Sequence, residues 1–438
     1  MGTNEQNQQE KRELRRKRRQ RSQFIAYTIV VIMILVLAAG IALAVSKITS
    51  MSRNQEEQQN KVDEIFSNEE TIQAPTESQE TVEELTDEQK LDTIINEAII
   101  QNMPLEDKVA GLFITTPESI TGVSAAVQAG DGTKDALSKY PVGGIVYAAR
   151  NIQSADQLKQ MIDNTKLYTS YPLFIAIDGE GSGTDAVAAA GLGTKVDTPQ
   201  SIGAGGDTSK AYMAGTTVGT YLAELGFNLD FAPYADLGVV DGNAAGSSSY
   251  GSEADNVASF VGYMQAGLQE QKVTTCIGQF PGIGSTTQST KDGMASTDRS
   301  AEDFRANEFA AFQTCIDNGM TKMIRVSAMA APSLTGDNTP CTLSGAVVTD
   351  VLRNELNFRG VIVSGAMNEA AISNYYGADE AAVMALRAGC DMIYAPENFE
   401  TAYNGVLEAV QNGTISEDRI NDSLRRIYRI KYADKLEQ

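Results

Sequence analysis

The sequence predicts an α/β protein whose main part is a (β/α)8, TIM-like barrel, preceded by a single N-terminal transmembrane helix and a disordered stalk. Three observations predict this order. Residues 24–46 form an uncharged apolar run, residues 47–93 are polar and acidic, and in residues 94–438 short apolar runs alternate with helical patterns. Such alternation is typical of folds built on a parallel sheet.

The N-terminal residues predict a membrane anchor. Residues 1–23 carry eight Lys and Arg and three Glu, which predicts a basic cytoplasmic tail. About 23 helical residues, rising about 1.5 Å each, cross a hydrocarbon core of about 30 Å. The basic cluster therefore predicts a single-pass protein of the cell membrane with a cytoplasmic N-terminus and an extracellular barrel. A cleaved signal peptide is the alternative, since residues 42–44 read Ala-Leu-Ala, but the apolar run exceeds the usual signal length of about 7–15 residues.

The stalk predicted at residues 47–93 is rich in Gln, Glu, Asn and Thr and holds few apolar residues. It lacks the apolar surface needed to fold alone, so we expect a solvated spacer. The whole chain has a formal net charge of −22, and residues 1–23 contribute +5, which leaves −27 for the rest. So acidic an exported portion argues against non-specific binding to nucleic acid.

Eight short apolar runs predict the barrel strands, at residues 111–115, 143–147, 173–178, 228–233, 273–277, 322–327, 361–364 and 391–395. Helical patterns lie between them, at residues 155–166, 210–225, 257–269, 302–318, 379–388 and 399–411. Eight strands separated by helices favour a closed barrel. An open, doubly wound sheet remains the alternative, because periodicity does not show closure.

The composition excludes several kinds of site. The chain has no histidine, which removes the usual general base near neutral pH and the commonest metal ligand. The four cysteines are far apart and form no CxxC pair, so we interpret them as buried thiols rather than as zinc ligands, disulfides or reactive thiols: Cys276, Cys315, Cys341 and Cys390. We therefore expect no metal and no cofactor.

The loop after the fifth predicted strand is the most conspicuous candidate site. In a barrel, functional side chains follow the C-terminal ends of the strands. This loop offers Gln279, Ser289 and Lys291 as ligand-binding candidates, yet its first carboxylate is Asp292. The loop thus lies where an active site is expected but lacks the side chains that usually carry out catalysis.

Carboxylates follow other strands. Asp178 ends the third strand and could bind a ligand hydroxyl or serve the structure. Hydrolysis of a glycosidic bond requires two carboxyl groups that flank one sugar. Glu180, Asp292 and Glu369 could supply such a pair only if two of their loops point inward.

Five segments resemble the single-barrel β-N-acetylglucosaminidases of glycoside hydrolase family 3. They read MPLEDKVAGLF at 103–113, VGGIVYAARNIQSADQLKQMI at 142–162, LGFNLDFAPYADLG at 225–238, GVIVSGAMNEAAI at 360–372 and ISEDRINDSLRRIYRIK at 415–431. The resemblance implies the barrel and the hydrolysis of terminal N-acetylglucosamine by β-N-acetylhexosaminidase chemistry.

The positions that carry this chemistry in the family are substituted here. The family's sugar-binding KHFPGHG motif aligns with GQFPGIG at 278–284, and its Asp-Ser-His acid/base loop aligns with Ser-Thr-Lys at 289–291. The nucleophilic Asp corresponds to Gly365, the Arg after the third strand to Gly183, and the His after the sixth strand to Ala328. Of the family's sugar contacts, Asp178 is retained.

These substitutions favour a pseudoenzyme, because glycine cannot form the covalent intermediate of a retaining glycosidase and an exposed lysine is a poor acid/base catalyst at neutral pH. We therefore expect an anchored, catalytically degenerate barrel that binds a cell-wall glycan or an envelope protein. The alternative is an active β-N-acetylhexosaminidase that uses displaced carboxylates. A third possibility is a structural spacer.

Overall fold

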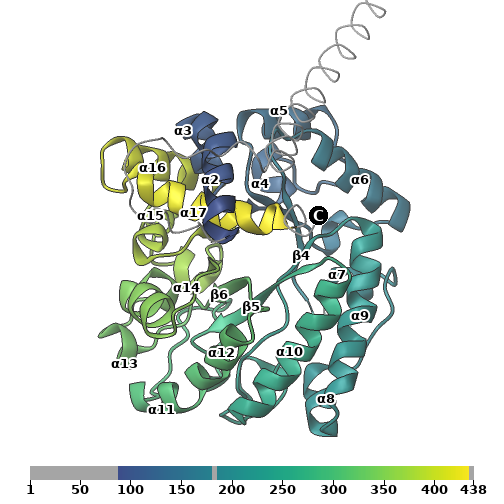
Figure 1. Cartoon of the computed structure of the whole chain (residues 1–438), viewed down its shortest axis with the longest axis vertical. Coiled ribbons are helices and arrows are strands. Elements are labelled where there is room, and N and C mark those ends of the chain that lie inside the picture. The colour runs from purple at the N-terminus through teal and green to yellow at the C-terminus, as the bar shows by residue number, and fades with distance from the viewer. Residues whose placement is uncertain (1–86, 180–184, 434–438) are drawn as a thin grey trace, which may run out of the picture. The chain divides into compact units, whose positions relative to one another are not determined.

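The computed structural model describes residues 87–179 and 185–433 (Figure 1). Eight parallel strands close into one barrel in the order β1 to β8. Their bounds are Phe113–Thr115, Gly144–Val146, Phe174–Ile177, Leu229–Asp230, Thr274–Phe280, Met323–Val326, Val361–Ala366 and Met392–Tyr394. Strands β1 and β8 pair through Phe113 with Ile393 and Ile114 with Tyr394. The predicted barrel is confirmed, and this closing pair makes the open-sheet alternative wrong.

Helices follow the strands around the barrel (Figure 1). Their bounds are α2 Asp87–Ala98, α3 Leu105–Ala110, α4 Pro117–Thr121, α5 Asp131–Lys139, α6 Ala155–Leu167, α7 Ala186–Ala189, α8 Pro199–Gly205, α9 Thr208–Leu225, α10 Ala254–Glu270, α11 Ala301–Ala306, α12 Glu308–Asp317, α13 Pro332–Thr335, α14 Ala370–Ser373, α15 Ala378–Ala388, α16 Phe399–Gln411 and α17 Glu417–Lys431. A π-helical segment, Ala346–Glu355, precedes β7.

The predicted helix at residues 302–318 is wrong as a single element. It is divided into α11 and α12 at Asn307, where the backbone leaves the helical conformation at φ −125° and ψ −78°. At the break, the backbone N–H and the side-chain amide of Asn307 both donate to the carbonyl of Asp303, at 3.1 and 2.9 Å. The pattern of apolar residues continues through this break, so periodicity alone does not reveal it.

Sequence signals set several helix ends. At the start of α6, Ser154 accepts from the N–H of Gln157 while the Gln157 side chain accepts from the N–H of Ser154, a capping box. Helix α9 ends at Gly226, whose φ of 96° favours glycine. Helices α9 and α10 approach closely at Gly215 and Gly267, where an added Cβ would lie 2.3 Å from a backbone oxygen of the other helix.

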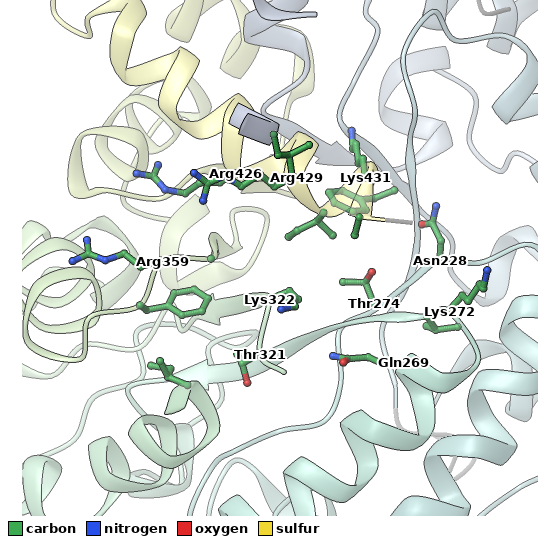
Figure 2. Close-up of a pocket in the computed structure, with 18 of the residues that line it drawn as sticks. Asn228, Gln269, Lys272, Thr274, Thr321, Lys322, Arg359, Arg426, Arg429 and Lys431 are labelled. Carbon is green, nitrogen blue, oxygen red and sulfur yellow. The ribbon is translucent and has the colours of Figure 1, made fainter. Parts of the chain in front are cut away.

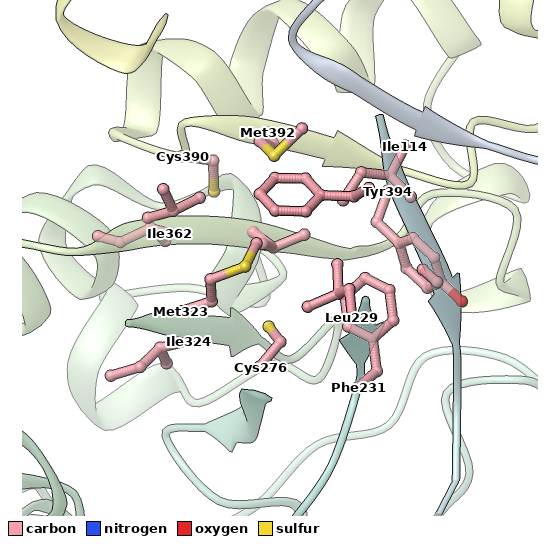
Figure 3. Close-up of a cluster of buried hydrophobic side chains, with 14 of the residues drawn as sticks. Ile114, Leu229, Phe231, Cys276, Met323, Ile324, Ile362, Cys390, Met392 and Tyr394 are labelled. Carbon is pink, nitrogen blue, oxygen red and sulfur yellow. The ribbon is translucent and has the colours of Figure 1, made fainter. Parts of the chain in front are cut away.

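The centre of the barrel is filled by apolar side chains from several strands, as Figure 3 shows. Leu229, Cys276, Met323 and Met392 are 0% exposed and come from β4, β5, β6 and β8. All four cysteines of the chain are buried and free, which confirms their interpretation as buried thiols.

The predicted cytoplasmic tail, the membrane segment at residues 24–46 and most of the predicted stalk lie outside the described residues. Helix α2 begins at Asp87, inside the stretch assigned to the stalk, and Leu91 on it is buried. The stalk prediction therefore extends too far toward the barrel. Within residues 87–179 and 185–433, none of the helices has the length and apolar character that crossing a bilayer requires.

Candidate functional site

Three side chains form a layer at the mouth of the barrel, the end where the strands terminate. Phe231 follows β4, Arg325 lies in β6 and Tyr394 ends β8. Each stands two residues after a side chain of the central cluster, and residues two apart on a strand share a face. Figure 3 shows Phe231 and Tyr394 close to that cluster. An arginine thus occupies one place in an otherwise aromatic layer, directly above the buried core.

Arg325 is held by partners on two neighbouring loops. Its Nη1 donates to Oδ2 of Asp178 at 2.7 Å, and its Nη2 donates to the hydroxyl of Tyr234 at 2.8 Å. The Tyr234 hydroxyl also donates to Oδ1 of Asp178 at 3.4 Å. The side chain of Arg325 is 5% exposed and that of Asp178 is 35% exposed. The carboxylate at the end of β3 is therefore already engaged by a buried cation of the same chain.

Aromatic rings surround the Arg325 guanidinium. Its carbon lies 5.2 Å from the ring centroid of Phe231, 5.4 Å from that of Tyr234 and 5.8 Å from that of Tyr394. Such distances are in the range of cation–π attraction. Burial disfavours the charged form, but the Asp178 carboxylate and the two tyrosines raise the pKa of Arg325 well above its ordinary value. Arg325 is a permanent cation in an aromatic cage.

The loop at residues 278–284 is fastened by Asp236. Its two carboxylate oxygens accept from the backbone N–H groups of Gln279 and Ile283, each at 2.6 Å. Burial raises the pKa of Asp236 to about 7, although these two donors lower it. Gly282 has φ 138°, and a Cβ at Gly284 would lie 1.9 Å from a backbone oxygen. These constraints explain why both glycines are needed for the loop conformation.

The second half of the same loop lies against α14. The N–H of Ala371 donates to the carbonyl of Thr290 at 2.9 Å. Within the turn, the N–H of Lys291 donates to the hydroxyl of Ser289 at 3.2 Å. Lys291 and Asp292 are exposed at the surface. Ser289 therefore serves the turn, while the Lys291 ammonium is available to solvent.

A family model described as "Glycosyl hydrolase family 3 N terminal domain" matches residues 104–430, most of the chain and the whole barrel. The chain belongs to glycoside hydrolase family 3.

Relatives in this family agree with that assignment. The chain is 26% identical over 324 residues to a beta-hexosaminidase A of Pseudoalteromonas piscicida, spanning 67% of this chain but 54% of that protein. It is 29% identical over 263 residues to a beta-hexosaminidase of Nitrosomonas eutropha, spanning 59% of this chain and 74% of that protein. The chain thus covers about half of the first relative's length.

A solved structure resembles the barrel at comparable identity. A family 3 beta-N-acetylglucosaminidase from Paenibacillus sp. has a TM-score of 0.69 at 29% identity, covering 77% of this chain and 64% of that one. A beta-N-acetylhexosaminidase from Beutenbergia cavernae has a TM-score of 0.67 at 25% identity, covering 76% of this chain and 99% of that one.

Gly365, which the sequence resemblance assigns to the family's nucleophile position, lies in a tightly packed part of β7. An added Cβ there would lie 3.0 Å from the Ala328 nitrogen and the Val326 oxygen, and 3.3 Å from the Cβ of Ala328. The Gly365 N–H donates to the hydroxyl of Thr342 at 3.0 Å. Placing any side chain at residue 365 thus requires the end of β6 to move by a few tenths of an ångström.

Gly278, which the sequence resemblance assigns to the family's sugar-binding Lys position, faces Arg325. An added Cβ at Gly278 would lie 3.6 Å from both Cβ and Nε of Arg325. The positive charge at this place in the mouth therefore comes from the neighbouring strand β6. In Figure 3 the core residues below it, Cys276 and Met323, belong to the same two strands.

The remaining candidate carboxylates differ in their surroundings. Glu180 and Gly183 lie outside the described residues. Glu369, which precedes α14, is partly buried and acts electrostatically on Tyr394. Burial raises the pKa of Tyr394 above its ordinary value, and Asp178 and Glu369 raise it further. Asp178 and Glu369 are thus brought near the same ring, whereas Asp292 is exposed on the loop.

Sequence reasoning missed Arg325, Tyr234 and Tyr394. The available signal was the lone charge in Met-Ile-Arg-Val at residues 323–326, because a buried cation requires a nearby acidic partner. Among residues 87–179 and 185–433, no group of three His, Cys, Asp or Glu side chains is arranged to hold a metal ion.

Proposed function

We propose that this chain is a non-hydrolytic member of glycoside hydrolase family 3 that acts as a binding module. The single observation that carries the proposal is the state of the mouth, where Asp178 is paired with Arg325 at 2.7 Å. A sugar hydroxyl that approached Asp178 would have to compete with a buried guanidinium for the same carboxylate.

The nucleophile position supports the same conclusion. A retaining glycosidase needs a carboxylate at the anomeric carbon and a second carboxyl group about 5–5.5 Å from it. Residue 365 is a glycine whose surroundings leave little room for a side chain. Residue 291, at the acid/base position, is an exposed lysine. Neither position supplies the chemistry that the family mechanism requires.

Because Asp178 at the mouth is already paired with Arg325, we favour a protein partner over a glycan. Glycan binding relies on unengaged polar side chains, and the retained Asp178 is the one sugar contact that the resemblance transfers. The exposed rim around Lys291 and Asp292 would instead contact an envelope protein. The uncharged run at residues 24–46, with the basic residues before it, would anchor the barrel at the outer face of the cell membrane.

An active β-N-acetylhexosaminidase is the second candidate function. Two observations favour it. The relatives at 26–29% identity are named beta-hexosaminidases. Glu369 also lies close enough to Tyr394 to influence its ionisation, which places one carboxylate near the mouth. In this case Glu369 would act with Asp292 or Glu180 as a displaced pair.

Hydrolysis of an aryl β-N-acetylglucosaminide by the purified full-length chain tests the proposal. A good leaving group departs with little help from an acid, so this assay isolates the missing nucleophile. We expect the aryl alcohol to be released no faster than by spontaneous hydrolysis. We also expect the substitution Gly365→Asp alone to restore no hydrolysis. The matched variants are Glu369→Gln and Asp292→Asn. Turnover by the unmodified chain that either variant abolishes would overturn the proposal in favour of the active hexosaminidase.

A further inference from the structure

A cavity of about 830 Å³ lies at the opposite end of the barrel, where the strands begin. We call it the base cavity. Its lining includes Phe174, Thr274 and Gly360, which start or immediately precede β3, β5 and β7, and residues of helix α17. The mouth layer, in contrast, lies at or near the C-terminal ends of the strands. This cavity is independent of the proposed function of the mouth.

The base cavity is strongly basic although the chain is acidic. Its lining contains one carboxylate, Asp317, and six basic side chains, which are Lys272, Lys322, Arg359, Arg426, Arg429 and Lys431; burial lowers the pKa of Lys431 to about 7. Figure 2 shows Arg426, Arg429 and Lys431 on α17 with Arg359, Lys322 and Lys272 arranged around them. The whole chain has a formal net charge of −22, so six basic side chains against one acidic side chain is the reverse of its general composition.

The carboxylates behind the lining neutralise only part of this charge. Arg426 donates to Asp391 at 2.9 Å, but Arg353 and Arg419 share the same carboxylate, at 2.7 and 3.6 Å. Arg429 is paired with Asp92. Three guanidinium groups around one carboxylate leave an excess of positive charge beside the cavity.

The cations nearest solvent are exposed. Lys272, Lys322 and Arg359 are exposed, and Lys322 donates to the carbonyl of Gly319 at 3.0 Å. Lys272 also has a φ of 61°, a conformation that glycine adopts without strain and lysine does not. A lysine is therefore present at a position after α10 where the backbone alone would favour glycine.

Two neutral amide side chains of the cavity are already used by the fold. Asn228 accepts from the N–H of Ile175 and donates to the carbonyl of Leu173. Gln269 donates to Thr275 and to the carbonyl of Met320. A neutral sugar would need such groups, whereas an anion needs the cations. The chemistry of the lining thus selects for negative charge.

We propose that the base cavity binds a phosphate-bearing polyanion. Arginine and lysine side chains on several elements suit a ligand with more than one phosphate group, because each phosphate accepts from several N–H donors. The volume is within the range of about 300–1,000 Å³ typical of sites for small molecules and exceeds the need of one inorganic phosphate. The phosphates belong either to a soluble polyphosphate chain or to an anionic lipid headgroup.

Titration calorimetry of the full-length chain in a non-ionic detergent with inorganic tripolyphosphate tests this proposal. We expect saturable binding that weakens about tenfold or more between about 50 and about 300 mM NaCl, since salt screens exposed charges. The double variant Lys272→Glu/Arg359→Glu should weaken binding at least about tenfold, because it reverses two exposed cations of the lining. The matched control, Lys195→Glu/Lys210→Glu, reverses two exposed lysines outside the cavity and should change it less than about twofold.

Two results would overturn the proposal: no tripolyphosphate binding at low salt, or equal loss of binding in the cavity variant and the control. Circular dichroism checks that both variants are folded. Mixed micelles distinguish the two sources of phosphate. Competition by micelles with phosphatidylglycerol but not phosphatidylcholine supports a lipid headgroup, and competition by neither supports a soluble polyphosphate.

Discussion

At the mouth of the barrel one arginine is enclosed by partners, whereas at the base six basic side chains line a cavity together with one carboxylate. Arg325 has Asp178 at 2.7 Å, Tyr234 at 2.8 Å and three aromatic rings around it. Around the base cavity, Arg353, Arg419 and Arg426 converge on Asp391 alone. The charge of Arg325 at the mouth is paired within the chain, whereas the positive charge at the base is paired only in part.

This difference separates two kinds of site. A site whose charged groups are paired internally offers little to a ligand, since binding must first break those pairs. A site with unneutralised charge gains from an external counter-ion. We therefore expect the mouth of this barrel to bind charged ligands weakly and the opposite end to be the one that recognises anions.

The largest effect should come from Asp391→Asn at the base. Burial opposes ionisation of Asp391, but Arg353, Arg426 and Arg419 hold its pKa below the ordinary value. Removing the charge leaves three guanidinium groups without their shared partner, so we expect a loss of about 3–5 kcal/mol in the free energy of unfolding. Urea denaturation measures it. The control Asp317→Asn, at an exposed lining residue, should cost less than about 0.5 kcal/mol; equal losses would contradict the central role of Asp391.

A somewhat smaller effect is expected from Asp178→Asn at the mouth. The variant leaves a buried arginine that keeps Tyr234 and the aromatic rings but loses its counter-ion, which should cost about 2–4 kcal/mol. Urea denaturation again gives the value. A change below about 0.5 kcal/mol, the size expected for an exposed residue, would show that Asp178 is not the partner that holds the cation.

The pH dependence of stability offers a third test, through Lys431 at the base. Its ammonium lies 4.9 Å from the ring centroid of Phe174 and 5.2 Å from that of Tyr428, and burial lowers its pKa to about 7 from 10.5. Between these pH values the unfolded chain binds more protons than the folded chain, so the free energy of unfolding should rise with pH through this window.

We expect this rise to be about 1–3 kcal/mol larger in the unmodified chain than in Lys431→Met, measured by urea denaturation from pH about 7 to about 10. The variant also loses the hydrogen bond from Lys431 to the carbonyl of Gly143. That loss lowers stability at every pH in the window but leaves the slope unchanged. If the free energy of unfolding rose equally with pH in the unmodified chain and in Lys431→Met, the lowered pKa of Lys431 would be contradicted.

The smallest effect should be that of Gly365→Ala. The added Cβ meets the Ala328 nitrogen and the Val326 oxygen at 3.0 Å, so the end of β6 must shift, at a cost of about 1–2 kcal/mol. Lys291→Ala, on the exposed loop, is the control and should lie within about 0.5 kcal/mol of the unmodified chain. If Gly365→Ala were also neutral, the position would have room for a side chain and the mouth would be less closed than described.

The sequence was sufficient for the barrel because strand and helix patterns are local. Each of the eight predicted apolar runs overlaps a strand, although β5 and β7 continue beyond theirs, and the predicted helix at residues 399–411 matches α16 in both bounds. The break at Asn307 was not predicted, since the apolar pattern continues across it.

The site was harder to predict, because the mouth depends on contacts between distant residues. Asp178 and Arg325 are 147 positions apart, and nothing in the neighbourhood of either residue shows that they pair. The base cavity was missed for the same reason. Lys272, Arg359 and Arg429 belong to three separate segments that only the closed barrel brings together.

A double-mutant cycle on Asp178 and Arg325 tests the account of the mouth most directly. The free energy of unfolding is measured for the unmodified chain, Asp178→Asn, Arg325→Gln and the double variant. If the two side chains hold each other in place, the losses of the two single variants should add up to more than the loss of the double variant. The difference, the coupling energy, should be about 2 kcal/mol or more. Additivity within about 0.5 kcal/mol would mean that Asp178 is free to serve a ligand, and would contradict an internally occupied mouth.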